Sequence, residues 1–208
     1  MNSNAELIQF LVKDGYLKTP GIAEAFKAID RKDFVPEEIK KQAYENTALP
    51  LMAGQTISQP SVVAFMLELL ELKPGEKVLD IGTGSGWVTC LLAYLIGESG
   101  CVISIERILE LHEFAKTNLE KYIQAAQVEL VLGDGSRGYK DQVPYDKIIV
   151  AAADKEISEI WKEQLKIGGR IVAPVEDSII VIDKISKNEF SRKEYFGFSF
   201  VPLLRGIE

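Results

Sequence analysis

The sequence KVLDIGTGSG at positions 77–86 places three glycines directly after a short apolar segment. Residues 78–81 have the length and composition of a buried strand, and residues 87–95 carry apolar side chains at helical spacing. Glycine is favoured where a ligand lies against the main chain or where φ is positive, and the first turn of a helix presents free N–H groups to polar ligand atoms. This segment therefore predicts a strand, a glycine loop and a helix that together bind a nucleotide-like cofactor.

The glycine spacing and two nearby acids indicate which cofactor this is. A dinucleotide-binding loop has its third glycine one residue later than this one. Asp80 lies at the strand end, where a carboxylate repels a pyrophosphate and attracts an ammonium group. The next apolar run, residues 101–105, ends in Glu106, which is placed to accept hydrogen bonds from ribose hydroxyls. S-adenosylmethionine has an ammonium group, a ribose and no phosphate, so the pattern favours it. The alternative is a plain glycine turn with solvated carboxylates.

Apolar runs that fit buried strands alternate with segments of helical spacing after residue 60. The predicted strands are residues 78–81, 101–105, 128–132, 146–151 and 170–173, and the predicted helices are residues 60–72, 87–95, 109–122 and 157–165. This alternation predicts an α/β fold with a doubly wound parallel sheet, whose ligands bind at the carboxyl ends of the strands. Residues 178–185 and 194–203 are predicted as two closing strands, whose order in the sheet the pattern leaves open.

The part of the chain before the first sheet strand has a different character. Helical spacing over residues 5–17 and 20–29, and a short helix beginning at Pro36, predict a helical segment added to the α/β core. Residues 45–60 have no sustained period and are long for a connector, so we expect a functional loop there. We expect residues 1–60 to pack on a cofactor-binding part, residues 61–208, as one structural unit.

Composition excludes several classes of function. The net charge is −7 and no run of Lys or Arg is longer than two residues, which disfavours a nucleic acid as partner. Cys90 and Cys101 lie among apolar neighbours, as free buried thiols do. His112, the single histidine, lies in a helical pattern among charged residues, so the sequence predicts neither a Ser/His/Asp triad nor a metal site. No leader or membrane-spanning stretch is evident, and we expect a cytoplasmic protein.

A chain with one histidine is compatible with methyl transfer to a carboxylate. Transfer from a sulfonium mainly requires the nucleophile, the methyl group and the sulfur to be aligned. A carboxylate, with a pKa near ~4, is already ionised at neutral pH and needs no catalytic base.

Eight segments of the chain resemble one family in sequence and in order. They are GQTISQP at 54–60, VLDIGTGSG at 78–86, SIER at 104–107, GDG at 133–135, PYDKIIV at 144–150, AAA at 151–153, GGR at 168–170 and FVPL at 200–203. Together they resemble the protein-L-isoaspartate O-methyltransferase family. Many methyltransferases share the glycine loop, whereas the segment at 54–60 is specific to this family.

The resemblance implies a seven-stranded, mostly parallel Rossmann-like methyltransferase sheet and a set of site residues. Ser58 is implied as the active-site serine, in a loop with Thr56 and Ile57 that covers the methyl group and holds the isoaspartyl carboxylate. The implied cofactor residues are Asp80, Gly82 and Gly84 for the amino-acid end, Glu106 for the ribose, and Asp134 and Gly135 for the adenine, with Thr83 and Arg107 also in the cofactor site. The implied peptide cleft includes Ala152, Phe200, Val201 and Pro202.

Two positions have alternative interpretations, and two others depart from the family pattern. Ser58 could instead cap the helix that begins at Pro60, and Asp134 could be an ordinary turn aspartate. Ser61 stands where members of the family often carry histidine or tyrosine, and Asp154 stands where they often carry proline. Both of these departures flank the expected cleft, so they bear on substrate preference more than on the cofactor.

The resemblance implies a repair enzyme that methylates the α-carboxylate of L-isoaspartyl residues in damaged proteins and peptides, with S-adenosylmethionine as methyl donor. We expect a monomer, because no exposed apolar seam is evident in the sequence. One alternative is another carboxyl or small-molecule methyltransferase with an altered cleft. Another is a catalytically inactive, cofactor-binding adaptor that recruits partners through the N-terminal helices. The intact segment 55–58 argues against the adaptor.

Overall fold

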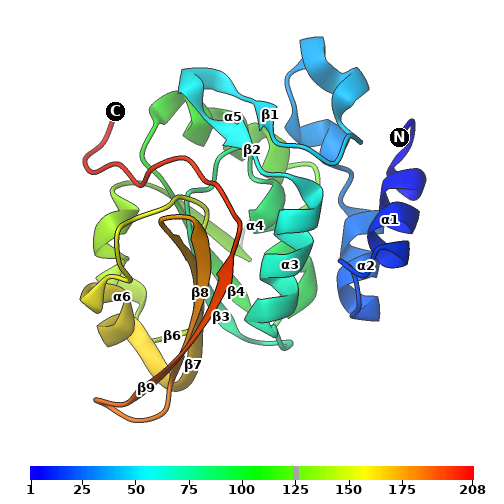
Figure 1. Cartoon of the computed structure of the whole chain (residues 1–208). Coiled ribbons are helices and arrows are strands. Elements are labelled where there is room, and N and C mark those ends of the chain that lie inside the picture. The colour runs from blue at the N-terminus through cyan, green and yellow to red at the C-terminus, as the bar shows by residue number, and fades with distance from the viewer. Residues whose placement is uncertain (124–126) are drawn as a thin grey trace.

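A computed structural model describes residues 1–123 and 127–208 and places a seven-stranded sheet between helical layers (Figure 1). The strands of this sheet are β3 (Lys77–Ile81), β4 (Cys101–Glu106), β5 (Val128–Leu132), β6 (Tyr145–Val150), β7 (Leu165–Val175), β8 (Ser178–Lys184) and β9 (Phe190–Phe196). Their order is β5-β4-β3-β6-β7-β8-β9, in which β3 to β7 run parallel, β8 is antiparallel to β7, and β9 is antiparallel to β8. The prediction of a mostly parallel α/β sheet is confirmed.

The helices precede and separate the strands. They are α1 (Asn4–Lys13), α2 (Pro20–Ala28), α3 (Pro60–Leu70), α4 (Trp87–Ile96), α5 (Leu109–Leu119) and α6 (Glu159–Gln164). Local sequence explains their starts: the Ser3 side chain accepts a hydrogen bond from the Glu6 N–H at the start of α1, and proline opens α2 and α3. Short 3₁₀ turns complete the set at η1 (Arg31–Phe34), η2 (Glu37–Gln42), η3 (Met52–Gly54), η4 (Gly135–Arg137) and η5 (Lys140–Gln142).

The parallel strands are mostly continuous apolar runs. Because alternate residues of a strand point to opposite sides, both faces of the sheet are apolar. On β3, Val78 belongs to the core that also contains side chains of α1 to α4, whereas Leu79 and Ile81 belong to the opposite core with Trp161 of α6. Of the N-terminal helices, α2 packs directly on α4, where the Phe26 ring meets the Trp87 ring edge-on at 5.4 Å between centroids.

Three predicted elements are wrong in part. The last strand ends at Phe196, not at residue 203, because Gly197 has φ +96° and turns the chain while its N–H donates to the Asp177 carbonyl. The helix predicted from Pro36 is a 3₁₀ segment. The strand predicted at residues 170–173 is longer, because β7 begins at Leu165 and includes Gly168 and Gly169.

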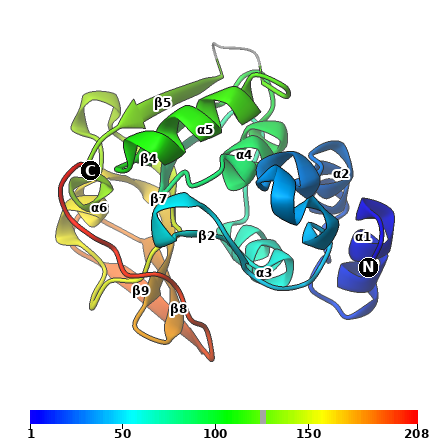
Figure 2. The same cartoon turned by 90° about the horizontal axis from the view of Figure 1, so that it is seen from above.

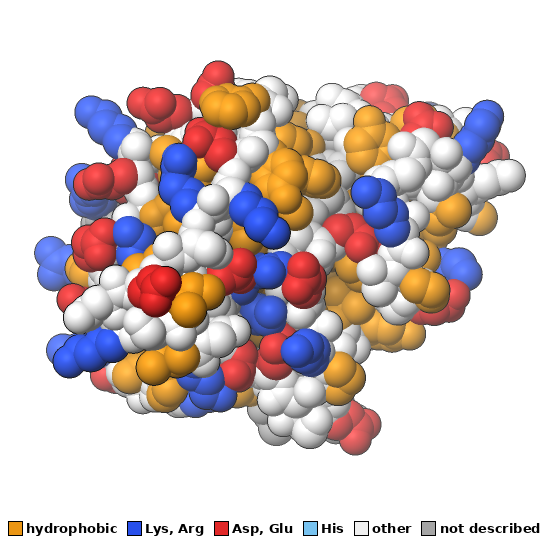
Figure 3. Space-filling model, turned by 60° about the horizontal axis from the view of Figure 1, so that its bottom comes forward, with side chains coloured by type: hydrophobic (Ala, Val, Ile, Leu, Met, Phe, Trp, Pro, Cys, Tyr) orange, Lys and Arg blue, Asp and Glu red, His pale blue; other side chains and the backbone are white. Residues whose placement is uncertain are grey.

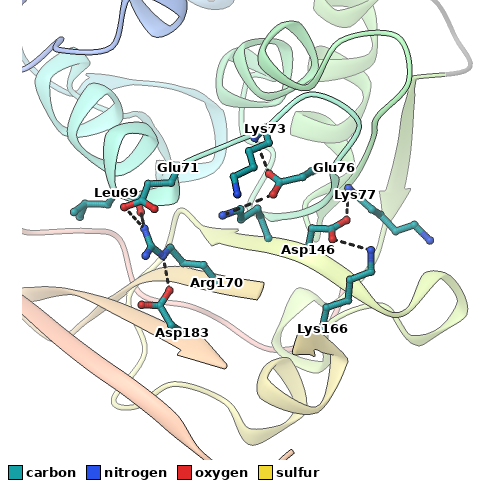
Figure 4. A network of polar contacts seen from close by, with 10 residues as sticks. Leu69, Glu71, Lys73, Glu76, Lys77, Asp146, Lys166, Arg170 and Asp183 are labelled. Carbon is teal, nitrogen blue, oxygen red and sulfur yellow. Dashed lines mark hydrogen bonds and ion pairs between the residues drawn. The ribbon is translucent and has the colours of Figure 1, made fainter. Parts of the chain in front are cut away.

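Charged side chains fasten the amino-terminal edge of the sheet, away from the carboxyl ends of the parallel strands. Arg170 on β7 donates to the Leu69 carbonyl at 2.7 Å and pairs with Glu71 at 2.7 Å and Asp183 at 2.6 Å (Figure 4). Arg170 therefore links the end of α3 to the sheet. Figure 3 shows that the bottom of the molecule carries side chains of both charges side by side.

Gly100, just before β4, offers a test of this packing. A Cβ at this position would lie 2.7 Å from Ile96 Cγ1 and 2.8 Å from the Glu76 carbonyl oxygen. We expect Gly100→Ala to lower the free energy of unfolding in urea by about 1–3 kcal/mol, because the Glu76 main chain cannot easily move to make room for the added methyl group. The control is Gly21→Ala in α2, where no atom lies within 4 Å; it should be neutral or stabilising by up to about 1 kcal/mol. Equal stabilities of the two variants would contradict the packing described.

Candidate cofactor and substrate site

A cavity of about 850 Å³ opens at the carboxyl ends of β3, β4 and β6. Figure 2 looks down on this edge, with β2 (Thr56–Ile57) and the chain around it above α3 and the C-terminal segment on the other side. Residues from three predicted groups line the cavity: the Thr56–Ser58 loop, the glycine loop with Glu106, and the strand-following segments at 151–152 and 200–203. A cavity of this size suits a ligand of cofactor dimensions together with part of a second molecule.

The glycine loop turns sharply over the end of β4. Gly82, Gly84 and Gly86 all have positive φ, at +93°, +56° and +87°, a region that other residues rarely adopt. The N–H groups of Gly82 and Thr83 donate to the Ile105 carbonyl at 2.9 and 3.2 Å. The main chain of the loop therefore lines the cavity directly, as the spacing predicts for a ligand that approaches the backbone.

Glu106 holds the glycine loop in this position. Its Oε2 accepts from the Gly84 N–H at 2.9 Å, and its Oε1 accepts from the N–H groups of Arg107 at 2.9 Å and Ile108 at 3.0 Å. The side chain is 5% exposed and lines the cavity. A carboxylate oxygen has more than one lone pair, so Glu106 keeps capacity to accept from a ligand hydroxyl.

Asp80 lies behind the loop and not among the residues that line the cavity. Its Oδ2 accepts from the hydroxyls of Thr89 at 2.7 Å and Ser104 at 2.8 Å. Its Oδ1 is buried and has no hydrogen-bond partner within the residues that the structure describes. Burial raises the pKa of Asp80 to about 6, against the two hydroxyl bonds, which lower it. A buried carboxylate oxygen without a donor is a site for a donor from a ligand or an ordered water.

Of the two residues predicted to bind adenine, Gly135 lines the cavity and Asp134 does not. Gly135 lines the cavity, and a Cβ there would lie 2.5 Å from Ile81 Cγ2, so only glycine fits. The Asp134 side chain does not line the cavity: Oδ1 accepts from the Ser136 N–H and Oδ2 from the Gly206 N–H, both at 2.9 Å. Although burial alone would raise the pKa of Asp134, these bonds lower it below its ordinary range. Asp134 therefore fastens the C-terminal segment to the turn after β5.

Arg107 makes a second attachment for that segment. Its Nε donates to the Gly206 carbonyl at 2.9 Å, and its Nη1 pairs with Glu208 at 3.0 Å. Leu203 is held further along, because its N–H donates to the Ala153 carbonyl at 2.7 Å. The four predicted cleft residues Ala152, Phe200, Val201 and Pro202 all line the cavity beside this attachment.

The loop with Ser58 covers the other side of the cavity. β1 (Leu49–Pro50) pairs antiparallel with β2 (Thr56–Ile57), and Ser58 follows β2 directly. The residue that caps α3 is Gln59, without a side-chain cap bond, and within residues 1–123 and 127–208 the Ser58 hydroxyl neither accepts nor donates a hydrogen bond. The helix-cap interpretation of Ser58 therefore lacks the hydrogen bond it requires.

The two positions that depart from the family pattern differ in their placement. Ser61 is 4% exposed, lines the cavity and donates its N–H to Asn46 Oδ1 at 2.9 Å. Asp154 does not line the cavity; its carboxylate lies 3.6 Å from the Arg205 guanidinium. Ser61 is therefore the departure that can act on a ligand directly.

Other cavity residues are not identified by the sequence patterns. Tyr16, Phe65, Trp87 and Phe198 line the cavity from four separate segments. Trp87 follows the glycine loop immediately and could be found from that position, whereas the other three are brought there only by the tertiary fold. In the described part of the chain, no cluster of His, Cys, Asp or Glu could hold a metal ion, and Cys90 and Cys101 are free thiols. Among the same residues, no helix has the length and hydropathy needed to cross a membrane.

Comparison with known proteins gives a consistent result. The family model for protein-L-isoaspartate (D-aspartate) O-methyltransferase matches residues 2–208. A protein-L-isoaspartate O-methyltransferase of Ignicoccus hospitalis is 47% identical over 203 residues, 96% of each chain. One from Methanopyrus kandleri is 41% identical over 202 residues, 95% of this chain and 89% of the relative. A crystal structure from Plasmodium falciparum, described as such an enzyme with S-adenosyl-L-homocysteine, has a TM-score of 0.87 at 23% identity, covers 98% and 99% of the two chains, and shows the same fold.

Asp80→Asn tests whether the buried carboxylate is kept for a ligand. Without ligand, the wild-type protein should lose stability as the pH rises from about 4 to about 6, because the folded state then binds more protons than the unfolded state. The Asn variant lacks this loss, so its melting temperature relative to wild type should rise over that range and then level off. Calorimetry should show affinity for S-adenosylmethionine weaker by about tenfold. A melting difference that is independent of pH, with unchanged affinity, would contradict this role.

Proposed function

The chain belongs to the protein-L-isoaspartate (D-aspartate) O-methyltransferase family, and we propose that it transfers a methyl group from S-adenosylmethionine to the α-carboxylate of L-isoaspartyl residues in damaged proteins and peptides. One observation carries this proposal: a single cavity is lined both by the glycine loop with Glu106 and by the Thr56–Ser58 loop. The donor and the acceptor of the methyl group can therefore meet in it.

The cofactor residues act through main chain and carboxylates. In this proposal the backbone of Gly82, Thr83 and Gly84 receives the amino-acid end of the cofactor, with Asp80 behind it as the negative charge. Glu106 binds the ribose with Arg107 beside it, and Gly135 lies beside the adenine. The unpaired Asp80 oxygen and the place of Gly135 in the cavity lining support this fit.

When bound, the cofactor supplies a methyl group that forms a bond to a carboxylate oxygen as the carbon–sulfur bond breaks and sulfur keeps the electron pair, so no proton moves. The protein then has to orient the carboxylate and exclude competing water. Arg107 and Glu106 are the charged side chains among the residues that line the cavity, and Arg107 already pairs with Glu208. We assign the orientation of the substrate carboxylate to the Ser58 hydroxyl and the Thr56–Ser58 backbone. These groups are neutral, so the carboxylate keeps the negative charge that makes it a nucleophile.

The methyl ester formed in this way is chemically activated. The neighbouring backbone nitrogen displaces methanol to give a succinimide, which then hydrolyses in part to normal aspartate. These later steps need no group of the protein, so the proposed task of the chain ends with release of the ester. Ala152 and the Phe200–Pro202 segment are proposed to hold the surrounding peptide.

The remaining partners are also proposals. Action as a monomer stays a prediction from the sequence. The net charge of −7 and the lack of basic runs support a protein substrate over a nucleic acid. A cytoplasmic location stays a prediction from the sequence.

Ser58→Ala tests the proposed orientation of the carboxylate. Its hydroxyl binds the incoming carboxylate and not the cofactor, so affinity for S-adenosylhomocysteine should stay nearly unchanged. Turnover of an isoaspartyl peptide should fall by roughly ten- to a hundredfold, the effect of losing one orienting hydrogen bond. Ser191→Ala on β9, outside the cavity lining, is the control and should retain activity. Normal turnover by Ser58→Ala, or a trapped covalent intermediate on Ser58 in wild type, would contradict the proposal.

A further inference from the structure

Arg31, in η1, is fully buried and outside the cavity lining, yet it contacts the main chain of the Ser58 loop. Its Nη1 donates to the carbonyls of Ala43 at 2.8 Å and Glu45 at 3.3 Å. Its Nη2 donates to the carbonyls of Thr47 at 2.9 Å, Ser58 at 3.0 Å and Ile57 at 3.5 Å. One guanidinium therefore binds both ends of the segment between residues 43 and 58.

The same guanidinium reaches the cofactor side of the cavity. Its central carbon lies 5.4 Å from the centroid of the Trp87 ring, within the range of a cation–π contact. Trp87 is the first residue of α4, directly after the glycine loop, and it lines the cavity. Arg31 therefore connects the loop that carries Ser58 with the helix that follows the cofactor loop.

The charge of Arg31 is not explained by stability alone. Within residues 1–123 and 127–208 it has no ion pair with a carboxylate, and its Nε has no hydrogen-bond partner. Burial lowers the pKa of Arg31 to about 9, which still leaves it charged at neutral pH. A well-packed apolar side chain of similar volume is often as stabilising as a buried charge, but it could not bind several carbonyl oxygens in one plane.

We propose that Arg31 is a positioning residue for methyl transfer. It fixes the backbone of Ser58 over the cavity, so that the incoming carboxylate is aligned with the methyl group. This inference rests on the proposed function, because it assigns to Arg31 the placement of the loop that orients the substrate. Small displacements of an orienting group reduce rates strongly, so loss of Arg31 should reduce turnover much more than cofactor affinity.

A purely structural role makes a different prediction. Other contacts also hold the loop: Asn46 Oδ1 accepts from the Ser61 N–H, and Leu49 pairs with Ile57 across β1 and β2. If these contacts suffice to place Ser58, removal of Arg31 would lower the melting temperature and leave turnover of the folded protein unchanged.

The test compares Arg31→Lys with Arg170→Lys. Lysine keeps the charge but has no planar fork. Arg170 is the matched control because it also binds a carbonyl, that of Leu69, but lies at the opposite edge of the sheet (Figure 4). Both variants should melt at lower temperature, and both should bind S-adenosylhomocysteine within about threefold of wild type. Only Arg31→Lys should lower kcat on an isoaspartyl peptide, by about ten- to a hundredfold.

Hydrogen exchange provides a readout that needs no activity. In Arg31→Lys the amides of Leu51, Gln55 and Ile57 should exchange faster than in wild type, whereas those of β3 and β6 should not. Arg170→Lys should leave the loop amides unchanged. If wild type fails to methylate the peptide, the proposed function is wrong, and hydrogen exchange still decides whether Arg31 places the loop.

Chemical rescue covers a lysine variant that does not fold. Arg31→Ala, kept with S-adenosylmethionine, the methyl donor itself, to stabilise the folded state, should regain turnover when low concentrations of guanidinium chloride are added, and should not with sodium chloride. A folded Arg31→Lys protein with normal kcat and normal loop exchange would overturn the proposal. So would an Arg31→Ala protein that is already fully active without guanidinium.

Discussion

The carboxylate of Glu106 joins the two central strand ends into one binding surface. By accepting from the Gly84, Arg107 and Ile108 N–H groups, it ties the loop after β3 to the end of β4. Parallel strands bring their carboxyl ends to the same edge, but the loops that follow them have no ladder to fix their paths. A buried acceptor with several lone pairs supplies that constraint, and the positive φ values of the glycines allow the backbone to meet it.

Arg31, a buried group of opposite charge, likewise fixes the path of a loop on the other side of the cavity. The Arg31 guanidinium gathers carbonyl oxygens of residues 43–58, as Glu106 gathers N–H groups of the glycine loop. Irregular backbone is placed in both cases by one charged side chain bound to several main-chain atoms, an arrangement that is stronger than neutral hydrogen bonds. The two loops face one cavity, so their relative position decides how two bound molecules would meet.

Sequence patterns identify the parts of this arrangement that are local. The apolar runs give the five parallel strands, and the glycines after β3 give the loop, because each depends on residues adjacent in the chain. The end of β9 at Phe196 depends on the turn at Gly197, which the apolar residues around it conceal. The sequence places Asp80 and Asp134 near the site, but neither side chain faces the cavity. The direction of each carboxylate is set by a distant partner, Ser104 for Asp80 and Gly206 for Asp134. Arg31 has no local signal at all, because its partners lie 12 to 27 residues away.

The central claim is that these two loops present a methyl donor to one kind of carboxylate. The most direct measurement offers labelled S-adenosylmethionine together with a peptide that contains one L-isoaspartyl residue and with its aspartyl twin, identical in all other residues. The account predicts label in the isoaspartyl peptide, located at the α-carboxylate by mass spectrometry, and none above background in the twin. Equal labelling of both peptides, or labelling of neither while a small carboxylic acid is methylated, would contradict it.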